Sequence, residues 1–219
     1  GLVSSTATTL SFAGRSKTNA GLSTVLAQGI LLASCVMFPR VLIEVAVVNP
    51  GLVKQVVVPL VAMLIAGVIG FSILWRRGRA EKKAEHGGVE LSNPLRLTTA
   101  ITFGLVFAFV LVAVEAANEY FGSAGVYLAS VLTGITDVDS ITLSVSNLSL
   151  KGLLDARVAA MAIIMATIMN TITKAVMAMV LGTPRLRRLV SRAFGVVVLT
   201  GLISGALVFF FFDSSYRAV

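Results

Sequence analysis

The chain consists of long apolar runs separated by short polar turns, a pattern that predicts membrane-spanning helices. A helix needs about 20 apolar residues to cross a bilayer. Two pairs of runs are joined by turns that contain proline and glycine, as is typical of antiparallel neighbouring helices. We therefore predict an all-α integral membrane protein with about five spans. These spans are Gly21–Val48, Leu52–Trp75, Leu95–Phe121, Ala156–Leu181 and Leu189–Phe212.

Two further hydrophobic segments, Gly1–Phe12 and Ser123–Leu148, are interrupted by hydroxyl and carboxylate side chains. Irregular backbone at membrane depth is tolerated only where protein covers it or where it lines a wet cavity. Both segments are therefore predicted to be broken or re-entrant elements that enter the membrane without crossing it as one simple helix.

Composition supports this class of protein. Hydrophobic residues make up 57% of the 219 residues and charged residues only 13%, with a mean hydropathy of +0.95. A soluble domain has about 25% charged residues, so a soluble enzyme or a disordered chain is excluded. Cys35 and His86 are each the only residue of their type, which excludes an intrachain disulfide and a histidine-rich metal site.

The net charge of +8 comes from basic residues beside the apolar runs. Such residues orient membrane proteins by remaining on the cytoplasmic side. We therefore expect a lipid bilayer as the partner of this charge, and no nucleic acid.

An internal repeat is predicted within a single membrane domain that covers residues 1–219. Gly1–Ser11 can be aligned with Gly134–Ser144, and with one residue added to the offset Arg40 falls on Lys174 and Pro50 on Pro184. Residues 1–75 then form the first repeat, 76–94 a basic cytoplasmic loop and 95–219 the second repeat. The helix before the second broken segment has no counterpart in the first copy, so we expect a trimmed precursor or a sequence that starts partway through a gene.

Charge placement predicts that the two repeats have opposite orientations. If the 76–94 loop is cytoplasmic, the arginine-rich turn at 182–192 belongs on the same side, which requires Ser123–Leu148 to enter and leave on one face. Inverted repeats with broken elements are the architecture of many secondary transporters. The alternative is a parallel repeat in which Ser123–Leu148 spans fully and the arginines face outside.

Asp137 and Asp139 are the strongest candidates for binding chemistry. Residues two apart in an extended turn project to the same side, and Ser140 and Thr142 add hydroxyl oxygens. This donor set suits Mg²⁺ or a similar hard cation, so both aspartates are predicted metal ligands. Two alternatives stay open: the carboxylates could cap a helix, or they could neutralise basic residues at membrane depth.

Charges inside spans are costly and are usually functional. The predicted ion-binding lining adds Ser4, Ser5, Thr6, Arg40, Asn170 and Lys174 to the four residues above. Paired basic residues would suit an anion and paired aspartates a cation, so the sign of the ion stays open. No catalytic motif is present, and we expect no enzyme.

Several motifs resemble a membrane domain of unknown function that occurs C-terminal to the MgtC/SapB-type domain in bacterial proteins. They are Leu91–Leu97, Gly134–Ser144, Asn170–Lys174, Gly1–Thr9 and the stretch from Leu32 to Arg40. The resemblance covers nearly the whole chain. The sequence departs from the family pattern at its start, where the preceding helix and the MgtC-like domain of the family are missing. Its name implies a link to magnesium, and the missing domain or a second copy of the chain are the expected protein partners.

Two functional hypotheses follow. The first is a bacterial inner-membrane transporter or channel-like protein for a small ion, with Mg²⁺ favoured and a site where the two broken segments meet. The second is a membrane scaffold or regulatory subunit whose buried charges only tie helices together. The second predicts a tightly packed core with no water-accessible cavity near Asp137.

Overall fold

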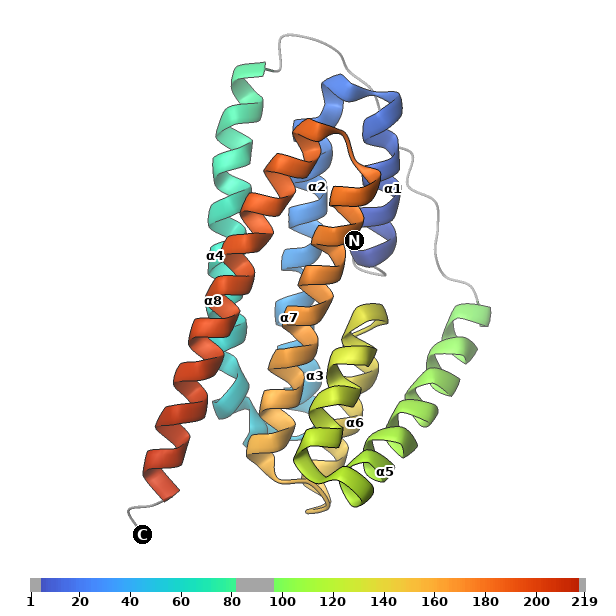
Figure 1. The fold of residues 1–219 in the computed structure, drawn as a ribbon, viewed down its shortest axis with the longest axis vertical. Helices are drawn as coiled ribbons and strands as arrows, with labels where there is room; N and C mark the ends of the chain where they lie inside the picture. Colours follow the sequence, from blue (N-terminus) through green and yellow to red (C-terminus); the bar gives the residue numbers. More distant parts are fainter. Residues whose placement is uncertain (1–4, 82–96, 217–219) are drawn as a thin grey trace.

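The computed structural model describes residues 5–81 and 97–216, with side chains over 5–78 and 112–210. These ranges are helical and contain no strand (Figure 1). The α-helices are α1 (Ser5–Thr18), α2 (Ser23–Cys35), α3 (Met37–Val48), α4 (Val53–Glu81), α5 (Leu97–Thr136), α6 (Asp139–Leu150), α7 (Ala156–Leu181) and α8 (Pro184–Tyr216). Two 3-10 turns, η1 (Ala20–Leu22) and η2 (Pro50–Leu52), precede α2 and α4. Residues 82–94 of the predicted basic loop, and Ser4, lie outside the described residues.

Four segments are long and apolar enough to cross a membrane, which makes this a membrane protein. They are Ala20–Val48, Pro50–Gly78, Ala156–Leu181 and Pro184–Phe210, and each corresponds to a predicted span. Large aliphatic side chains such as Ile65 and Ile69 on α4 and Leu199 and Ile203 on α8 are exposed, as expected where lipid covers a helix. The fifth predicted span, Leu95–Phe121, lies mostly where side chains are not described, so its crossing stays a prediction.

The first span is kinked between α2 and α3. Proline has no N–H and disrupts the helical hydrogen bond to the residue four positions earlier. Pro39 follows Cys35 by four residues, and α2 ends at Cys35 while α3 begins at Met37. Pro39 accounts for this break between α2 and α3, which places Met37 and Arg40 in the first turns of α3.

Helices α4 and α8 run in opposite directions and cross closely at glycines (Figure 1). A Cβ on Gly67 would lie 2.6 Å from the Sγ atom of Cys35 on α2 and 3.9 Å from Val197 on α8, and a Cβ on Gly201 would lie 2.8 Å from the Sδ atom of Met63 on α4. Each of these glycines thus faces the helix that carries the other. Small residues at such crossings let membrane helices approach closely.

The end of α4 and the start of α8 lie at the same end of the bundle. The side-chain amide of Gln28, near the start of α2, donates to the Leu74 carbonyl at 2.8 Å, and the Ser23 hydroxyl lies 2.9 Å from that of Thr183. The basic residues that follow those contacts therefore gather at one end: Arg76, Arg77, Arg185, Arg187, Arg188 and Arg192.

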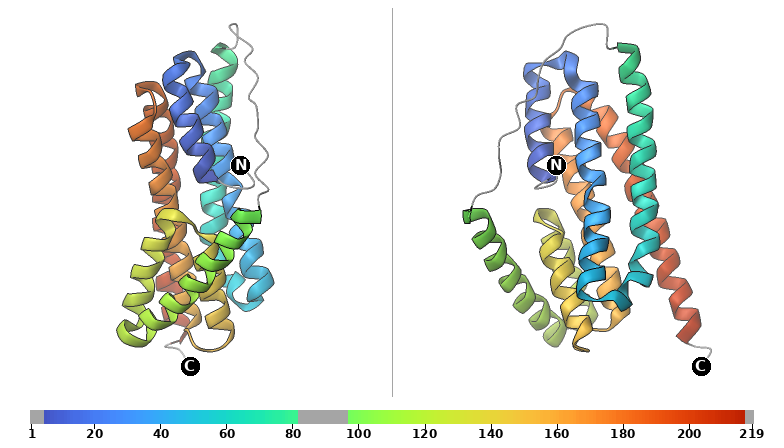
Figure 2. Two further views of the ribbon diagram at one scale, coloured as in Figure 1. Left: turned by 90° about the vertical axis from the view of Figure 1, so that its right-hand side faces the viewer. Right: turned by 180° about the vertical axis from the view of Figure 1, so that it is seen from behind.

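Two short helices, α1 and α6, lie end to end beside α7. Helix α1 has 14 residues and α6 has 12, whereas α7, which packs against both, has 26. From their facing ends, α1 runs to the top of the bundle and α6 runs to the bottom (Figure 2). Their amino-terminal ends therefore meet about halfway along the bundle.

The chain reaches α6 through a hairpin. Within α5, Gly122 has a φ of 58°, a left-handed conformation that glycine adopts without strain, and the chain turns back there. The second arm of α5, residues 123–136, then rises to the middle of the bundle and ends at Thr136 (Figure 1). The predicted break lies between Thr136 and Asp139.

Candidate functional site

The tip of the α5–α6 hairpin is held tightly against α7. A Cβ on Gly134 would lie only 2.6 Å from the carbonyl oxygen of Ala166, so the two backbones touch. One turn further along α7, the buried Asn170 amide donates to the Gly134 carbonyl at 2.9 Å. This bond satisfies a carbonyl near the end of α5, where intrahelical partners run out. Asn170 therefore positions the break.

Asp137 stabilises the start of α6. One of its carboxylate oxygens accepts hydrogen bonds from the Ser140 backbone N–H at 3.1 Å and from the Ser140 hydroxyl at 2.8 Å. A side-chain oxygen that accepts from a free N–H in the first turn is a helix cap. Asp137 and Ser140 thus make contacts of the capping kind.

Asp139 forms an ion pair with Arg40, which comes from α3. The Arg40 Nε atom also lies 3.3 Å from a carboxylate oxygen of Glu44, one turn along the same helix. The side chain of Asp139 is 6% exposed and that of Arg40 is 39% exposed. The guanidinium therefore connects a buried carboxylate at the break to a second carboxylate on α3.

Lys174 is fully buried on α7. Its ammonium donates to the Sδ atom of Met37 at 3.3 Å. The ammonium is also repelled by the positive charge of Arg40 and attracted by the negative charge of Asp137. A thioether is a weak acceptor, so this contact does little to replace the water that an ammonium loses on burial.

Five charged side chains are therefore gathered where the hairpin breaks: Arg40, Glu44, Asp137, Asp139 and Lys174. Of the predicted residues, the structure brings Arg40, Asp137, Asp139, Ser140 and Lys174 together here, with Asn170 beside them. Thr142 is buried one turn further along α6. Ser5 and Thr6 lie at the start of α1, which faces the break (Figures 1 and 2).

Glu44 and Met37 contact the cluster but are not among the predicted ion-binding residues. Glu44 had a signal in the sequence, because a residue four positions after Arg40 lies on the same helix face. Met37 had none, since its contact depends on how α3 packs on α7. In contrast Glu115, another charge within a predicted span, is exposed on α5.

The carboxylates at the break are held by protein groups in this arrangement. Among the described side chains, no group of three or more histidine, cysteine, aspartate or glutamate residues is placed to hold a metal ion. Magnesium binding by Asp137 and Asp139 stays a prediction, and it would require Arg40 to release Asp139.

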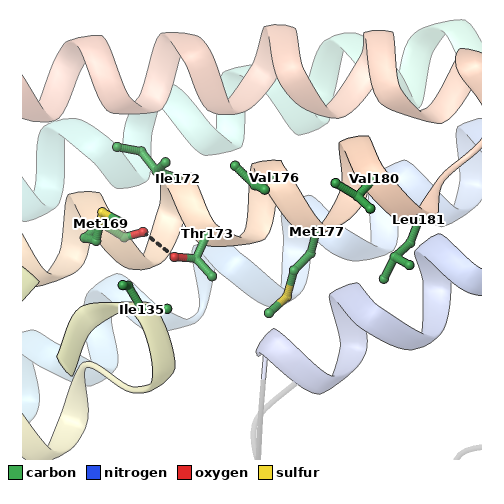
Figure 3. A pocket seen from close by; sticks show the side chains of 8 residues that line it. All are labelled: Ile135, Met169, Ile172, Thr173, Val176, Met177, Val180 and Leu181. Atoms are coloured by element: carbon green, nitrogen blue, oxygen red, sulfur yellow. Dashed lines mark hydrogen bonds between the residues drawn. The ribbon is translucent and has the colours of Figure 1, made fainter. Parts of the chain in front are cut away.

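A groove of about 440 Å³ lies next to the break on the outer side of α7 (Figure 3). Its lining is Ile135, Met169, Ile172, Thr173, Val176, Met177, Val180 and Leu181. The Thr173 hydroxyl donates to the Met169 carbonyl at 2.9 Å, as Figure 3 shows, so the lining offers almost no free polar group. An apolar groove of this kind does not bind an ion.

Comparison with known proteins identifies the family. The family model described as "Domain of unknown function (DUF4010)" matches residues 1–182. The chain belongs to this family. An uncharacterized protein of Aquifex aeolicus (strain VF5) is 34% identical to this DUF4010 chain over 190 residues, which cover 85% of the chain and 81% of the relative. No solved structure matches.

The family assignment confirms the resemblance to a domain of unknown function. It carries no link to the MgtC/SapB family, so the expected magnesium connection and the MgtC-like partner domain stay predictions. Function has to be argued from the charged cluster of this DUF4010 chain.

The burial of Lys174 leads to a prediction about stability. We expect Lys174→Met to raise the free energy of unfolding by about 1 kcal/mol, because it removes the cost of burying an ammonium whose hydrogen bond goes to a weak thioether acceptor. Thermal unfolding of the purified protein in detergent measures the change. Lys151→Met, at an exposed turn, is the matched control and should have no effect. A clear loss of stability in Lys174→Met alone would show that the ammonium is a structural tie.

Proposed function

We propose that this DUF4010 domain is a membrane transporter or channel-like protein for a small ion, with its site where the starts of α1 and α6 meet. The observation that carries the proposal is the gathering of five ionisable side chains at a helix break about halfway along an apolar bundle. Each charge at membrane depth costs a few kcal/mol or more, so such residues usually mark ion pathways. Helix breaks at the same depth are where transporters bind their substrates.

The proposal includes an inverted repeat, in which α1, α2–α3 and α4 correspond to α6, α7 and α8. Several features support it: α1 and α6 point in opposite directions, as do α4 and α8 (Figure 1). The repeat offset maps Gly67 onto Gly201 and Met63 onto Val197. Gly67 lies against Val197, and Gly201 lies against Met63, so the two contacts are equivalent under the two-fold axis that relates inverted repeats. The arginine-rich end of the bundle would face the cytoplasm of a bacterial cell, with the domain in its inner membrane.

A small cation is the first candidate substrate, with Mg²⁺ as its divalent form. Asp137, Asp139, Ser140 and Thr142 would supply oxygen ligands of the type that hard cations prefer. In this version the Arg40–Asp139 ion pair keeps the site closed until a cation arrives. The cation displaces the guanidinium from Asp139, and the guanidinium then pairs with Glu44 alone.

A small anion is the second candidate, and a separate observation favours it. The amino-terminal ends of α1 and α6 face each other, and such ends carry partial positive charge. Asp137 already caps α6, so the end of α1 together with Lys174 would form the positive side of the site. The two candidates differ in which ion crosses the membrane.

Reconstituted liposomes test both candidates. The full chain would be assayed for flux of Mg²⁺, Na⁺, protons and chloride, each with its own fluorescent reporter. We expect cation flux that falls at least about tenfold in Asp139→Asn, since about 1.4 kcal/mol of lost binding corresponds to a factor of ten. Glu119→Gln, which neutralises an exposed carboxylate on α5, is the matched control and should transport normally.

Each other outcome is decisive. Chloride flux that depends on Lys174 would favour the anion. Absence of flux for every ion, from a folded protein that retains its melting temperature, would reject transport and favour the scaffold, whose buried charges only tie helices together.

A further inference from the structure

One face of α6 carries polar side chains into the interior. Asp139, Thr142 and Ser146 are spaced by three and four residues, so they share this face, and they are 4%, 0% and 0% exposed. The hydroxyls of Thr142 and Ser146 have no hydrogen-bond partner. Elsewhere on α6 the Ser144 hydroxyl donates to the Ser140 carbonyl at 2.7 Å, which is the hydrogen bond to the carbonyl four residues earlier that serine commonly forms within a helix. The Thr142 and Ser146 hydroxyls do not form this hydrogen bond within the helix.

The helix that faces them is α3, and two contacts fix how the pair is aligned. At one end Arg40 pairs with Asp139, and at the other the Asn49 side-chain amide lies 3.4 Å from the Ser146 carbonyl. The two helices therefore run in the same direction from the break to the end of the bundle. Glu44 lies about 6 Å along α3 from Arg40 and Thr142 lies about 4.5 Å along α6 from Asp139, so the two residues are at similar depth.

Glu44 adds a third oxygen of the same kind. Its Oε1 atom accepts from Arg40, whereas its Oε2 atom is buried without a partner. Three such oxygens thus line the α3–α6 interface: that of Glu44 lies at the edge of the charged cluster, and those of Thr142 and Ser146 lie on α6 toward Asn49. A buried polar atom without a partner costs about 1–3 kcal/mol, and such atoms in native proteins are commonly satisfied by water or an ion.

The interface between α1 and α7 has no comparable row of oxygens. Here the repeat offsets place Ala13 where α6 has Ser146, and Ala178 where α3 has Glu44, and both alanines are fully buried. The two buried hydroxyls of α1 are bonded: Thr9 donates to the Ser5 carbonyl at 2.8 Å, and Ser16 accepts from the Thr183 backbone N–H at 3.0 Å. This half of the bundle is closed by apolar packing.

We propose that the α3–α6 interface is a hydrated half-channel that leads small cations, protons included, from the Asn49 end of the bundle to the charged cluster. The α1–α7 interface is the dry barrier on the other side. The wall oxygens come from one carboxylate and two hydroxyls, which accept from water and coordinate cations, and the carboxylate repels anions. The inference rests on the proposed function and assigns the transported charge as positive.

Cysteine accessibility tests the half-channel. In a Cys35→Ser background of the full chain, Thr142→Cys and Ser146→Cys place a thiol in the path. Ala13→Cys and Ala178→Cys place it in the barrier, at the positions that the repeat offsets match to Ser146 and Glu44. A membrane-impermeant cationic thiosulfonate is applied to right-side-out and inside-out vesicles. Thiols react as thiolates, so we expect labelling at least about tenfold faster at 142 and 146 than at 13 and 178. The labelling should occur from the Asn49 side only.

Equal labelling of the two pairs, or none at 142 and 146, would overturn the half-channel. Hydroxyl-radical footprinting of the parent protein provides a second measurement, which does not depend on whether a cysteine variant folds. Water in the α3–α6 interface should allow radicals to modify the middle of α6, whereas the middle of α1 should be protected. The outcomes also separate the two proposals. Flux without labelling leaves transport standing and rejects this path, whereas labelling without flux retains the hydrated interface and rejects transport.

Discussion

Arg40→Met is expected to lower the free energy of unfolding by about 3 kcal/mol, because it leaves Asp139 buried without its counter-ion. Asp139 has an almost completely buried side chain, so water cannot replace the guanidinium. The expected loss is placed at the low end of the range for a broken buried pair, about 3–5 kcal/mol, because Arg40 itself is partly exposed and solvent screens part of the interaction.

The double variant Arg40→Met with Asp139→Asn should recover most of this loss, since it removes both charges together. Equilibrium unfolding in detergent of the two single variants, the double variant and the parent gives the coupling energy directly. Lys54→Met, which removes an exposed positive charge, is the control and should be silent. A double variant as unstable as Arg40→Met would mean that the guanidinium acts through packing or through Glu44 instead of through Asp139.

Much of the fold could be predicted from the sequence because lipid imposes simple demands. Four spans follow from apolar length, and the kink before Arg40 follows from the missing N–H of Pro39. The break near Asp137 could be predicted because carboxylates two residues apart cannot continue a lipid-covered helix. These features are local, and each is encoded within one short segment.

The pairing within the site could not be predicted, because it joins distant segments. In an extended turn Asp137 and Asp139 would face the same way, yet α6 begins at Asp139. One carboxylate therefore caps the helix and the other turns to Arg40 on α3. The bond from Asn170 to Gly134 likewise joins residues 36 positions apart. Such choices depend on how helices pack, and the pattern of a single segment does not contain that information.

The tightest point of the site is the contact between Gly134 and α7, and it gives the second large prediction. Gly134→Ala adds a methyl group whose carbon would lie 2.6 Å from the Ala166 carbonyl oxygen and 2.9 Å from its Cα atom. Both are backbone atoms, so the hairpin has to move away from α7. We expect a loss of about 3 kcal/mol, near the upper end for overpacking. The shift would also stretch the Asn170 hydrogen bond and so displace the charged cluster.

The matched control is Gly195→Ala on α8, where an added Cβ meets nothing within 4 Å. That change should be neutral or stabilise the helix by up to about 1 kcal/mol, because alanine favours helix more than glycine does. Thermal unfolding of both variants in the same detergent compares them directly. If the two alanines behaved alike, the hairpin tip would not depend on close contact with α7, and the positioning of Asp137 and Asp139 would have to come from the Arg40 ion pair alone. A loss confined to Gly134→Ala would instead show that the break is held from α7 by backbone contact and from α3 by charge.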